Sequence, residues 1–265
     1  MKVTGAIWVC LLLIFASCNN QGKKVSISTI KFNCKYTSNP VHINQPYFDT
    51  LQVFISKLEP DLISFKETIF SDNCKSVIEA KGYQFIPIHH LQSDSNIFYS
   101  PIVYKSTSFT LLGSSFYIFK KEYLEKDKNI VSWFQLKNIQ TGHVFYLFNL
   151  QLQRVLNNEQ SEFIAYEVLR RIDNVSAGLP VILIGDFFSQ NTTLRKVLIN
   201  NWKGIYPLNE VNIVNGEISE FLVNDFFDVI TSSVNTNKDS LVNNVEFKFS
   251  TQKIKRNKSG NTIPE

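Results

Sequence analysis

Residues 179–188 contain one charged side chain, that of Asp186, in an otherwise apolar segment. Residues 181–184 are all aliphatic, without polar alternation, which is typical of a strand buried on both faces. Gly185 and Asp186 follow directly. We expect Gly185 to allow a tight turn and to leave Asp186 at the mouth of the strand, where α/β proteins gather catalytic groups. The structural alternative is a helix-capping aspartate after a core strand.

Three other apolar runs also predict strands. Ser28–Asn33 ends in an amide, and Pro60–Glu67 ends in a carboxylate. Phe145–Leu152 is the third, and a short loop and a helix follow it. Polar groups therefore lie near the ends of several predicted strands.

Helical and strand periodicity supplies the remaining elements. Apolar positions from Phe48 to Leu58 form a helical stripe that ends before Pro60, which indicates a β-α-β unit over residues 25–65. Between residues 83 and 152 the pattern is aromatic and β-branched, and Thr141-Gly142 marks a hairpin turn. The later predicted elements are helices at 159–173 and 194–199, an irregular Asn-rich stretch, and a last strand at 245–249.

The N-terminus has the pattern of a bacterial lipoprotein signal. Lys2 precedes an apolar stretch at residues 6–15, and small residues then lead to Cys18. We expect export, lipidation of Cys18, and an envelope location with the lipid as membrane anchor. The predicted divisions are a signal peptide at 1–17, a tether at 18–24 and one domain at 25–265. An uncleaved anchor is the alternative, but the stretch is shorter than the roughly 20 residues that span a bilayer.

Composition narrows the functional classes. The hydrophobic fraction of 44% is ample for a core, and a net charge of +4 is too small to argue for nucleic acid by itself. The basic run 253–258 suits a solvated loop or a phosphate-binding patch. Cys34 and Cys74 allow either a disulfide or two free thiols, and no Cys/His spacing suggests zinc. We expect a monomer.

In order and spacing, these segments resemble the magnesium-dependent endonuclease/exonuclease/phosphatase superfamily. Its signatures are a strand ending in Tyr-Asn, a Pro-Asp strand ending in Gln-Glu, then Asn-Thr-His-Leu, Gly-Asp-Phe-Asn and Ser-Asp-His-x-Pro. The matching segments here are Ser28–Asn33, Pro60–Glu67, Asn149–Leu152, Gly185–Phe188 and Gly260–Pro264. Residues 96–104 and 109–112 are similar to a family hairpin, and residues 245–249 to its Ile-Asp-Tyr-Ile-Phe strand.

The resemblance implies a fold and a set of site residues. The fold is a four-layered α/β sandwich, with two mixed sheets packed face to face and helices outside. Glu67 would hold Mg²⁺ or Mn²⁺ weakly, with Asn33 as a supporting amide. Asp186 and Asn149 would be the catalytic residues, with Asp186 orienting water.

Several positions depart from the family pattern. Gln151 stands where the family has His, and Phe188 stands where it has Asn. Asn261 and Thr262 replace the C-terminal Asp-His pair. Losing one positioned acid or base costs about 10²–10⁴ in rate, so the resemblance implies little turnover. A rescue by His89-His90 is the less favoured alternative.

Three interpretations follow. The first is an impaired relative, a pseudoenzyme, that binds a phosphate ester or a protein partner. The second is an active phosphoesterase or nuclease with an altered catalytic set. The third is a structural surface lipoprotein. The retained Glu67, Asn33 and Asp186 favour ligand binding over pure scaffold, and the departures favour the first interpretation over the second.

Overall fold

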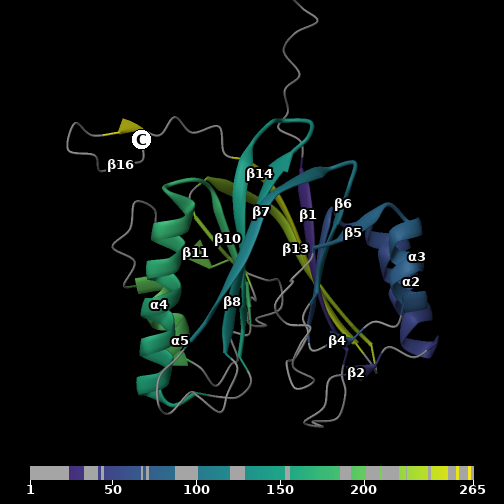
Figure 1. The fold of residues 1–265 in the computed structure, drawn as a ribbon, viewed down its shortest axis with the longest axis horizontal. Coiled ribbons are helices and arrows are strands. Elements are labelled where there is room, and N and C mark those ends of the chain that lie inside the picture. Colours follow the sequence, from purple (N-terminus) through teal and green to yellow (C-terminus); the bar gives the residue numbers. More distant parts are fainter. Residues whose placement is uncertain are drawn as a thin grey trace, which may run out of the picture.

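A computed structural model describes most of the chain between residues 24 and 263. The described residues are 24–32, 41–42, 45–66, 68–69, 72–86, 101–119, 129–152, 156–185, 192–200, 209–210, 221–224, 226–237, 240–249, 255–256 and 262–263. Within them, two six-stranded mixed sheets pack face to face, and helices cover their outer faces (Figure 1). The predicted four-layered α/β sandwich is confirmed.

The first sheet brings the two ends of the domain together. In spatial order it contains β13 (Phe227–Asn237), β14 (Ser240–Phe249), β1 (Val25–Phe32), β3 (Leu62–Lys66), β6 (Ile102–Lys105) and β5 (Tyr83–Phe85). β1 and β3 are parallel, and β1 pairs antiparallel with β14, so that Val25 lies opposite Phe247. The other neighbours in this sheet are antiparallel.

The second sheet has the same construction around a parallel central pair. In spatial order it contains β11 (Asn209–Glu210), β12 (Phe221–Val223), β10 (Val181–Gly185), β9 (Val144–Gln151), β8 (Ile130–Asn138) and β7 (Phe109–Ile118). β9 and β10 are parallel, and their other neighbours are antiparallel. Two small pairs lie outside the sheets: β2 (Val41–His42) with β4 (Thr68–Ile69), and β15 (Lys255–Arg256) with β16 (Thr262–Ile263).

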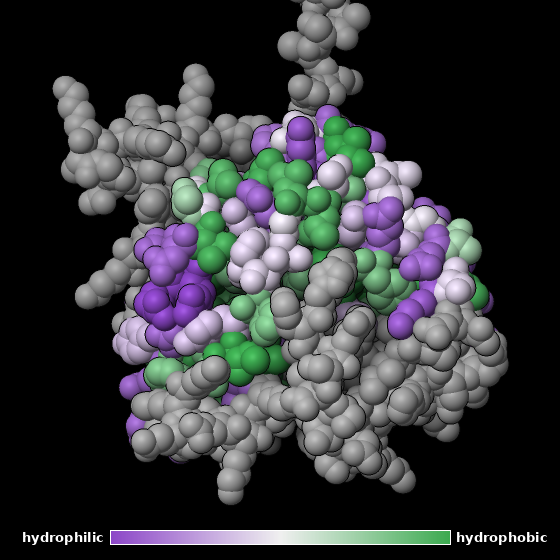
Figure 2. All heavy atoms as spheres, viewed as in Figure 1, coloured by the Kyte–Doolittle hydropathy of each residue, from purple (hydrophilic) through white to green (hydrophobic). Residues whose placement is uncertain are grey.

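Four described helices cover the sheets. They are α2 (Gln45–Leu58) and α3 (Asp72–Ala80) on the first sheet, and α4 (Asn158–Ser176) and α5 (Thr192–Asn200) on the second (Figure 1). α4 begins with a capping box, in which the side chain of Asn157 accepts from the Gln160 backbone and the Gln160 side chain accepts from the Asn157 backbone. Figure 2 shows hydrophilic side chains over the outer side of α4.

Three apolar clusters hold the layers together. The central cluster lies between the sheets and includes Ile27 and Leu62 from the first sheet and Phe145 and Leu147 from the second. A second cluster packs the outer face of the second sheet against α4 and α5. A third packs Ile63 and Phe65 of β3 with residues of α2 and α3. Both faces of β3, β9 and β10 are therefore covered, as their unbroken apolar runs predict.

The structure corrects two sequence predictions. Segments 96–104 and 109–112 do not form a hairpin, because β6 belongs to the first sheet and β7 to the second. A short turn, in which the Ser108 N–H donates to the Lys105 carbonyl, carries the chain from one sheet to the other. The Asn-rich stretch contains the eleven-residue strand β13. It is an edge strand that pairs through its backbone, so it needs no alternating apolar pattern.

The hairpin at Thr141-Gly142 is confirmed. The side chain of Asn138 accepts hydrogen bonds from the Gln140 and Thr141 N–H groups, and Gly142 has a φ of 73°. α3 is an element that the sequence reasoning did not predict. Among the described helices, none has the length and hydrophobicity needed to cross a bilayer.

Candidate functional site

The parallel strand pairs of the two sheets, β1 with β3 and β9 with β10, run in the same direction. The carboxyl ends of all four strands therefore mark the end of the sandwich at which the site is expected. The ring of Phe145, at the start of β9, lies 6.0 Å from that of Phe227 and 5.9 Å from that of Phe249. Phe249 ends β14, and β14 pairs antiparallel with the start of β1. The amino ends of β1 and β9 therefore meet, and the carboxyl ends of β1, β3, β9 and β10 lie at the opposite end of the sandwich. In Figure 1, β4 and α5, which follow β3 and β10, lie in its lower part.

Toward these carboxyl ends, the space between the sheets changes from apolar to polar. On β3, Leu62 is followed on the same face by Ser64 and Lys66. On β9, Leu147 is followed by Asn149 and Gln151. We call Ser64, Lys66, Asn149 and Gln151 the inner polar cluster. All four are buried, with exposed fractions of 1%, 1%, 0% and 6%.

The cluster lies in the part of the sandwich toward the carboxyl ends. Ser64 pairs with Thr29, which lies opposite Asn243, six residues before Phe249, and Asn149 comes four residues after Phe145. At about 3.3 Å per residue, Ser64 lies roughly 20 Å and Asn149 roughly 13 Å from the aromatic end. Lys66 and Gln151 lie two residues further on along their strands.

Asn149 is the decisive residue of the cluster. It is fully buried, and neither its Oδ1 nor its Nδ2 has a hydrogen-bond partner; the same holds for Oγ of Ser64, in the part of the chain that the structure describes. A buried polar group left unsatisfied costs about 1–3 kcal/mol, and native structures contain few of them. Asn149 therefore offers a donor and an acceptor that the described fold does not use.

Gly185 ends β10 in close contact with β9. Its φ is not positive, so a left-handed backbone is not the reason for glycine here, and the expected turn into Asp186 lies outside the described residues. A Cβ atom at Gly185 would instead lie 2.7 Å from the Cβ of Leu150 and 2.9 Å from the Leu150 carbonyl oxygen. Glycine is required because β10 approaches β9 too closely for any side chain. This close approach fixes the end of β10, directly before Asp186.

Comparison with known proteins supports the same architecture. No protein-family model matches the chain, and no curated protein sequence does. Among solved structures, an endonuclease/exonuclease/phosphatase family protein from Bacteroides thetaiotaomicron matches with a TM-score of 0.61 and 16% identity, covering 87% of this chain and 99% of that one. The chain has the endonuclease/exonuclease/phosphatase fold.

Two other proteins of this fold carry more specific names. A mannosyl-6-phosphatase of Bacteroides thetaiotaomicron matches with a TM-score of 0.59 and 16% identity, covering 85% of this chain and 100% of that one. The human Nocturnin catalytic domain, solved with a bound sulfate anion, matches with a TM-score of 0.61 and 15% identity, covering 87% of this chain and 97% of that one. At these identities, the likeness shows the fold of this chain.

The structure places some of the predicted site residues of this fold and leaves others undescribed. Asn149 and Gln151 lie together on β9. Outside the described residues are Cys18, Asn33, Cys34, Glu67, His89, His90, Asp186, Phe188 and Asn261. The backbone of Thr262 lies in β16, at the upper left of Figure 1 and away from β4 and α5, so the structure does not bring it to the strand ends. Cys74 lies in α3.

Sequence reasoning missed Ser64 and Lys66. A signal for Lys66 was present, because it stands directly before Glu67, where the family motif has Gln. Ser64 carries no comparable signal, since an isolated serine in an apolar strand fits many roles. Only the register and the burial of β3 assign it to the cluster.

The described residues do not form a metal site of His, Cys, Asp and Glu side chains. No group of three or more His, Cys, Asp or Glu side chains among them could hold a metal ion. The inner polar cluster supplies two amides, a hydroxyl and an ammonium group, and an ammonium group repels a cation. These residues fit an anion rather than Mg²⁺, so metal binding would depend on Glu67 and Asn33, which are not described.

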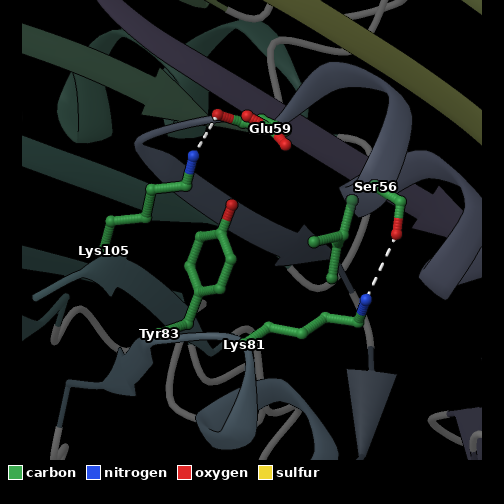
Figure 3. Close-up of a pocket in the computed structure, with 6 residues that line it drawn as sticks. Ser56, Glu59, Lys81, Tyr83 and Lys105 are labelled. Atoms are coloured by element: carbon green, nitrogen blue, oxygen red, sulfur yellow. Dashed lines mark hydrogen bonds between the residues drawn. The ribbon is translucent and has the colours of Figure 1, made fainter.

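A hollow lies near the opposite end of β3, close to Pro60. It has a volume of about 290 Å³ and is lined by Ile55, Ser56, Glu59, Lys81, Tyr83 and Lys105 (Figure 3). Lys105 Nζ donates to the Glu59 carbonyl at 2.6 Å, and Lys81 Nζ donates to Ser56 Oγ at 3.1 Å. These lysines bind groups at the C-terminal end of α2, which carries partial negative charge. The hollow is therefore explained by helix capping.

Tyr83 on the wall of this hollow is held in its neutral form. Its hydroxyl donates to the Pro60 carbonyl at 2.6 Å. Burial raises its pKa well above the ordinary value, and the nearby carboxylates of Asp61 and Glu59 raise it further. A tyrosine in this state is a structural hydrogen-bond donor, and it is not a base near neutral pH.

Proposed function

We propose that this protein binds a phosphate-ester ligand at the carboxyl ends of its central strands and hydrolyses it far more slowly than active enzymes of this fold, or not at all. The observation that carries the proposal is Asn149, a fully buried amide with both polar atoms unused by the described fold. Gln151 on the same strand, and Ser64 and Lys66 on the inner face of β3, are hydrogen-bonding groups that suit phosphate oxygens.

The proposed loss of turnover follows from the chemistry of the replaced groups. Gln151 occupies the position of the family histidine, and an amide is not a base near neutral pH. Phe188 replaces an asparagine and cannot donate a hydrogen bond to a developing oxyanion, a loss of about 10²–10³ in rate. Asn261 and Thr262 replace an Asp-His pair. Together these changes remove most of what the family pattern uses for acid-base chemistry.

Proteins that share the fold support a phosphate-like ligand. One is a mannosyl-6-phosphatase, and the human Nocturnin catalytic domain holds a sulfate anion. Sulfate has the tetrahedral shape of phosphate. These properties belong to those proteins. They favour a phosphate ester over a protein as the proposed ligand of the polar strand ends in this chain.

The proposal includes a location and a weak metal site. We place the protein in the bacterial envelope, as a monomer anchored by lipid on Cys18 after cleavage of residues 1–17. Glu67 and Asn33 would bind Mg²⁺ or Mn²⁺ weakly, because Mg²⁺ is usually held by few carboxylates together with substrate phosphates. When bound, the ion would neutralise charge on the phosphate. Mass spectrometry of the mature N-terminus tests the lipid; an intact signal would contradict it.

Turnover and binding are tested in one set of measurements. The purified protein is assayed with Mg²⁺ or Mn²⁺ on a panel of phosphodiesters and phosphomonoesters, and calorimetry measures binding of the same compounds. We expect binding with negligible hydrolysis. We also expect that Gln151→His and Phe188→Asn together raise hydrolysis, and that adding Asn261→Asp and Thr262→His raises it further only if the C-terminal segment reaches the strand ends. Robust turnover by the unmodified protein, abolished by Glu67→Ala, would instead establish the active-phosphoesterase alternative.

A further inference from the structure

Ser132 on β8 lies directly beside Asn149 on β9. The two residues are opposite each other in the antiparallel pairing of these strands. Such a pair has its Cβ atoms about 4.5–5.5 Å apart. Ile130 and Phe134, two positions to either side of Ser132, belong to the apolar cluster between the sheets, and so does Leu147 on β9. Strand alternation therefore puts the side chains of Ser132 and Asn149 together on the inner face of the second sheet.

Both side chains are fully buried, and the described fold uses neither of them. Ser132 Oγ, Asn149 Oδ1 and Asn149 Nδ2 have no hydrogen-bond partner in the part of the chain that the structure describes. The two side chains are close enough to bond to each other across the strands, yet they do not. Native folds contain few such groups, because a buried polar atom without a partner is destabilising. Two of them side by side indicate a site for a molecule that the fold itself does not supply.

Within the second sheet, the pair is enclosed by apolar side chains on three sides. Its neighbours on the same face are aliphatic or aromatic: Phe116 on β7, Ile130 and Phe134 on β8, Leu147 on β9 and Ile184 on β10. Toward the carboxyl end of β9, the next inward residue is the polar Gln151. None of these described positions carries a charge, so the pair is a neutral hydrogen-bonding site that a ligand would reach from the carboxyl ends of the strands.

The three unused groups differ in what they require of a ligand. Asn149 Nδ2 needs an acceptor and Asn149 Oδ1 needs a donor, whereas the Ser132 hydroxyl can serve as either. A phosphate dianion or a sulfate ester has acceptors alone, so it would leave Asn149 Oδ1 without a partner. A phosphomonoester that carries one proton has a P–OH donor beside its acceptor oxygens. It also brings one negative charge fewer to the neutral positions around the pair, where a charge is costly to bury.

We infer that Ser132 and Asn149 together bind the phosphoryl group of a phosphomonoester in its singly protonated form. Ser132 Oγ and Asn149 Nδ2 donate to phosphoryl oxygens, and Asn149 Oδ1 accepts from the P–OH group. This inference rests on the proposed function and adds to it a second binding residue, on β8, and a preference for phosphomonoesters over phosphodiesters and sulfate esters. Ser132 lies outside the segments that resemble the family signatures, so its contact is not part of that resemblance.

Calorimetry of the purified protein with phenyl phosphate and phenyl sulfate tests this inference. At about pH 6 a phosphomonoester is about half protonated, and phenyl sulfate has the charge and shape of that protonated form without its donor. The titrations are made in EDTA, so that a metal ion cannot cause the preference, and are repeated with Mg²⁺. We expect the wild type to bind phenyl phosphate roughly 10-fold or more tightly than phenyl sulfate.

Three substitutions of Ser132 isolate its hydroxyl. Ser132→Thr keeps the hydroxyl and should bind phenyl phosphate nearly as the wild type does. Ser132→Val has the shape of the threonine variant without the hydroxyl, and it should bind roughly 10-fold more weakly. Ser132→Ala adds no volume and should show a similar loss, so a variant that is too large for the site cannot leave the inference untested.

Thermal unfolding separates a binding role from a structural one. Without ligand, Ser132→Val should unfold at or above the temperature of Ser132→Thr, because the hydroxyl has no partner in the fold to lose. Ser28 is the matched control: it is equally buried, but its Oγ donates to Asn244 Oδ1 at 2.8 Å. Ser28→Ala should therefore lower the melting temperature and leave binding unchanged. If a buried water joined Ser132 to Asn149 instead, Ser132→Val would unfold below Ser132→Thr and bind equally well, which would overturn the inference.

The remaining outcomes also decide. Wild-type affinity for phenyl phosphate in Ser132→Ala would overturn the inference, and so would equal binding of phenyl phosphate and phenyl sulfate by the wild type. If Asn149→Leu still abolishes binding in either case, the proposed function remains. If binding requires Mg²⁺, the same comparisons made with Mg²⁺ decide in the same way. Absence of binding with and without Mg²⁺, for phosphomonoesters and phosphodiesters alike, would overturn both proposals.

Discussion

Gly185→Ala tests whether the close approach of β10 to β9 fixes the end of the site. The added Cβ would lie 2.7 Å from the Cβ and 2.9 Å from the carbonyl oxygen of Leu150. Carbon atoms pack best at about 3.5–4.0 Å, so the strands must separate by roughly 0.8 Å or more. Neither atom of Leu150 belongs to the mobile end of a side chain, so rotation of that side chain cannot relieve the contact.

The expected loss follows from this geometry. Overpacking of a well-packed interior costs about 1–3 kcal/mol. For a domain of this size, each kcal/mol lowers the melting temperature by about 2–4 °C, so we expect a decrease of about 2–12 °C. Because Asp186 follows Gly185 directly, the same displacement should weaken ligand binding. Urea unfolding and calorimetry with phenyl phosphate measure the two effects.

A second strand glycine provides the control. A Cβ at Gly113 on β7 would lie 3.8 Å from the ring of Trp133, an ordinary contact. Gly113→Ala should therefore be neutral, or stabilise by up to about 1 kcal/mol because alanine has less freedom in the unfolded chain. Equal losses in the two variants, or a neutral Gly185→Ala, would refute the reasoning.

Three further changes have defined outcomes. Asn149→Leu should leave the free energy of unfolding unchanged or raise it by about 1–3 kcal/mol, measured in urea, while phosphate binding is lost; a marked destabilisation would mean that the amide is satisfied in the fold. Asn157→Ala removes the capping box of α4 and should lower stability by about 1 kcal/mol in the same assay, unless the helix start is held by packing alone. The pKa of Tyr83 is higher in the folded protein than the value of about 10 in the unfolded chain, so its contribution to stability is complete below about pH 10 and is lost as the pH rises above 10. Tyr83→Phe should therefore flatten the alkaline decline of the melting temperature. An unchanged decline would contradict this.

The sequence predicts the architecture well because the central strands are covered on both faces. The unbroken run at 181–184 and the strand at 145–152 predict their own burial, and the helix over residues 159–173 lies inside the observed α4. β13 was not predicted because an edge strand pairs through backbone groups whatever its side chains are. The chain leaves the first sheet after β6 and enters the second sheet at β7. This change of sheet depends on contacts between residues distant in sequence, and the local hydrophobic pattern does not show such contacts.

The candidate site could be predicted only in part. Asn149 and Gln151 were identifiable from the family motif, and their shared strand was correct. That Asn149 has no partner in the described fold depends on how both sheets pack, so no local pattern contains it. The close approach that requires glycine at position 185 was not predicted, because it depends on how β10 packs against β9, which no local pattern contains.

The pairing of β1 with β14 has a consequence for how this chain acquires its structure. Ser28 Oγ donates to Asn244 Oδ1 at 2.8 Å across 216 positions of sequence. Until the second of these strands has been synthesised, one edge of β1 has no partner, and such edges invite association with other chains. Contacts this distant in sequence also slow folding. The first sheet should therefore close late, after translation is nearly complete. Pulse-labelled hydrogen exchange during refolding would show protection of β1 and β14 arising together, and early protection of β1 alone would contradict this order.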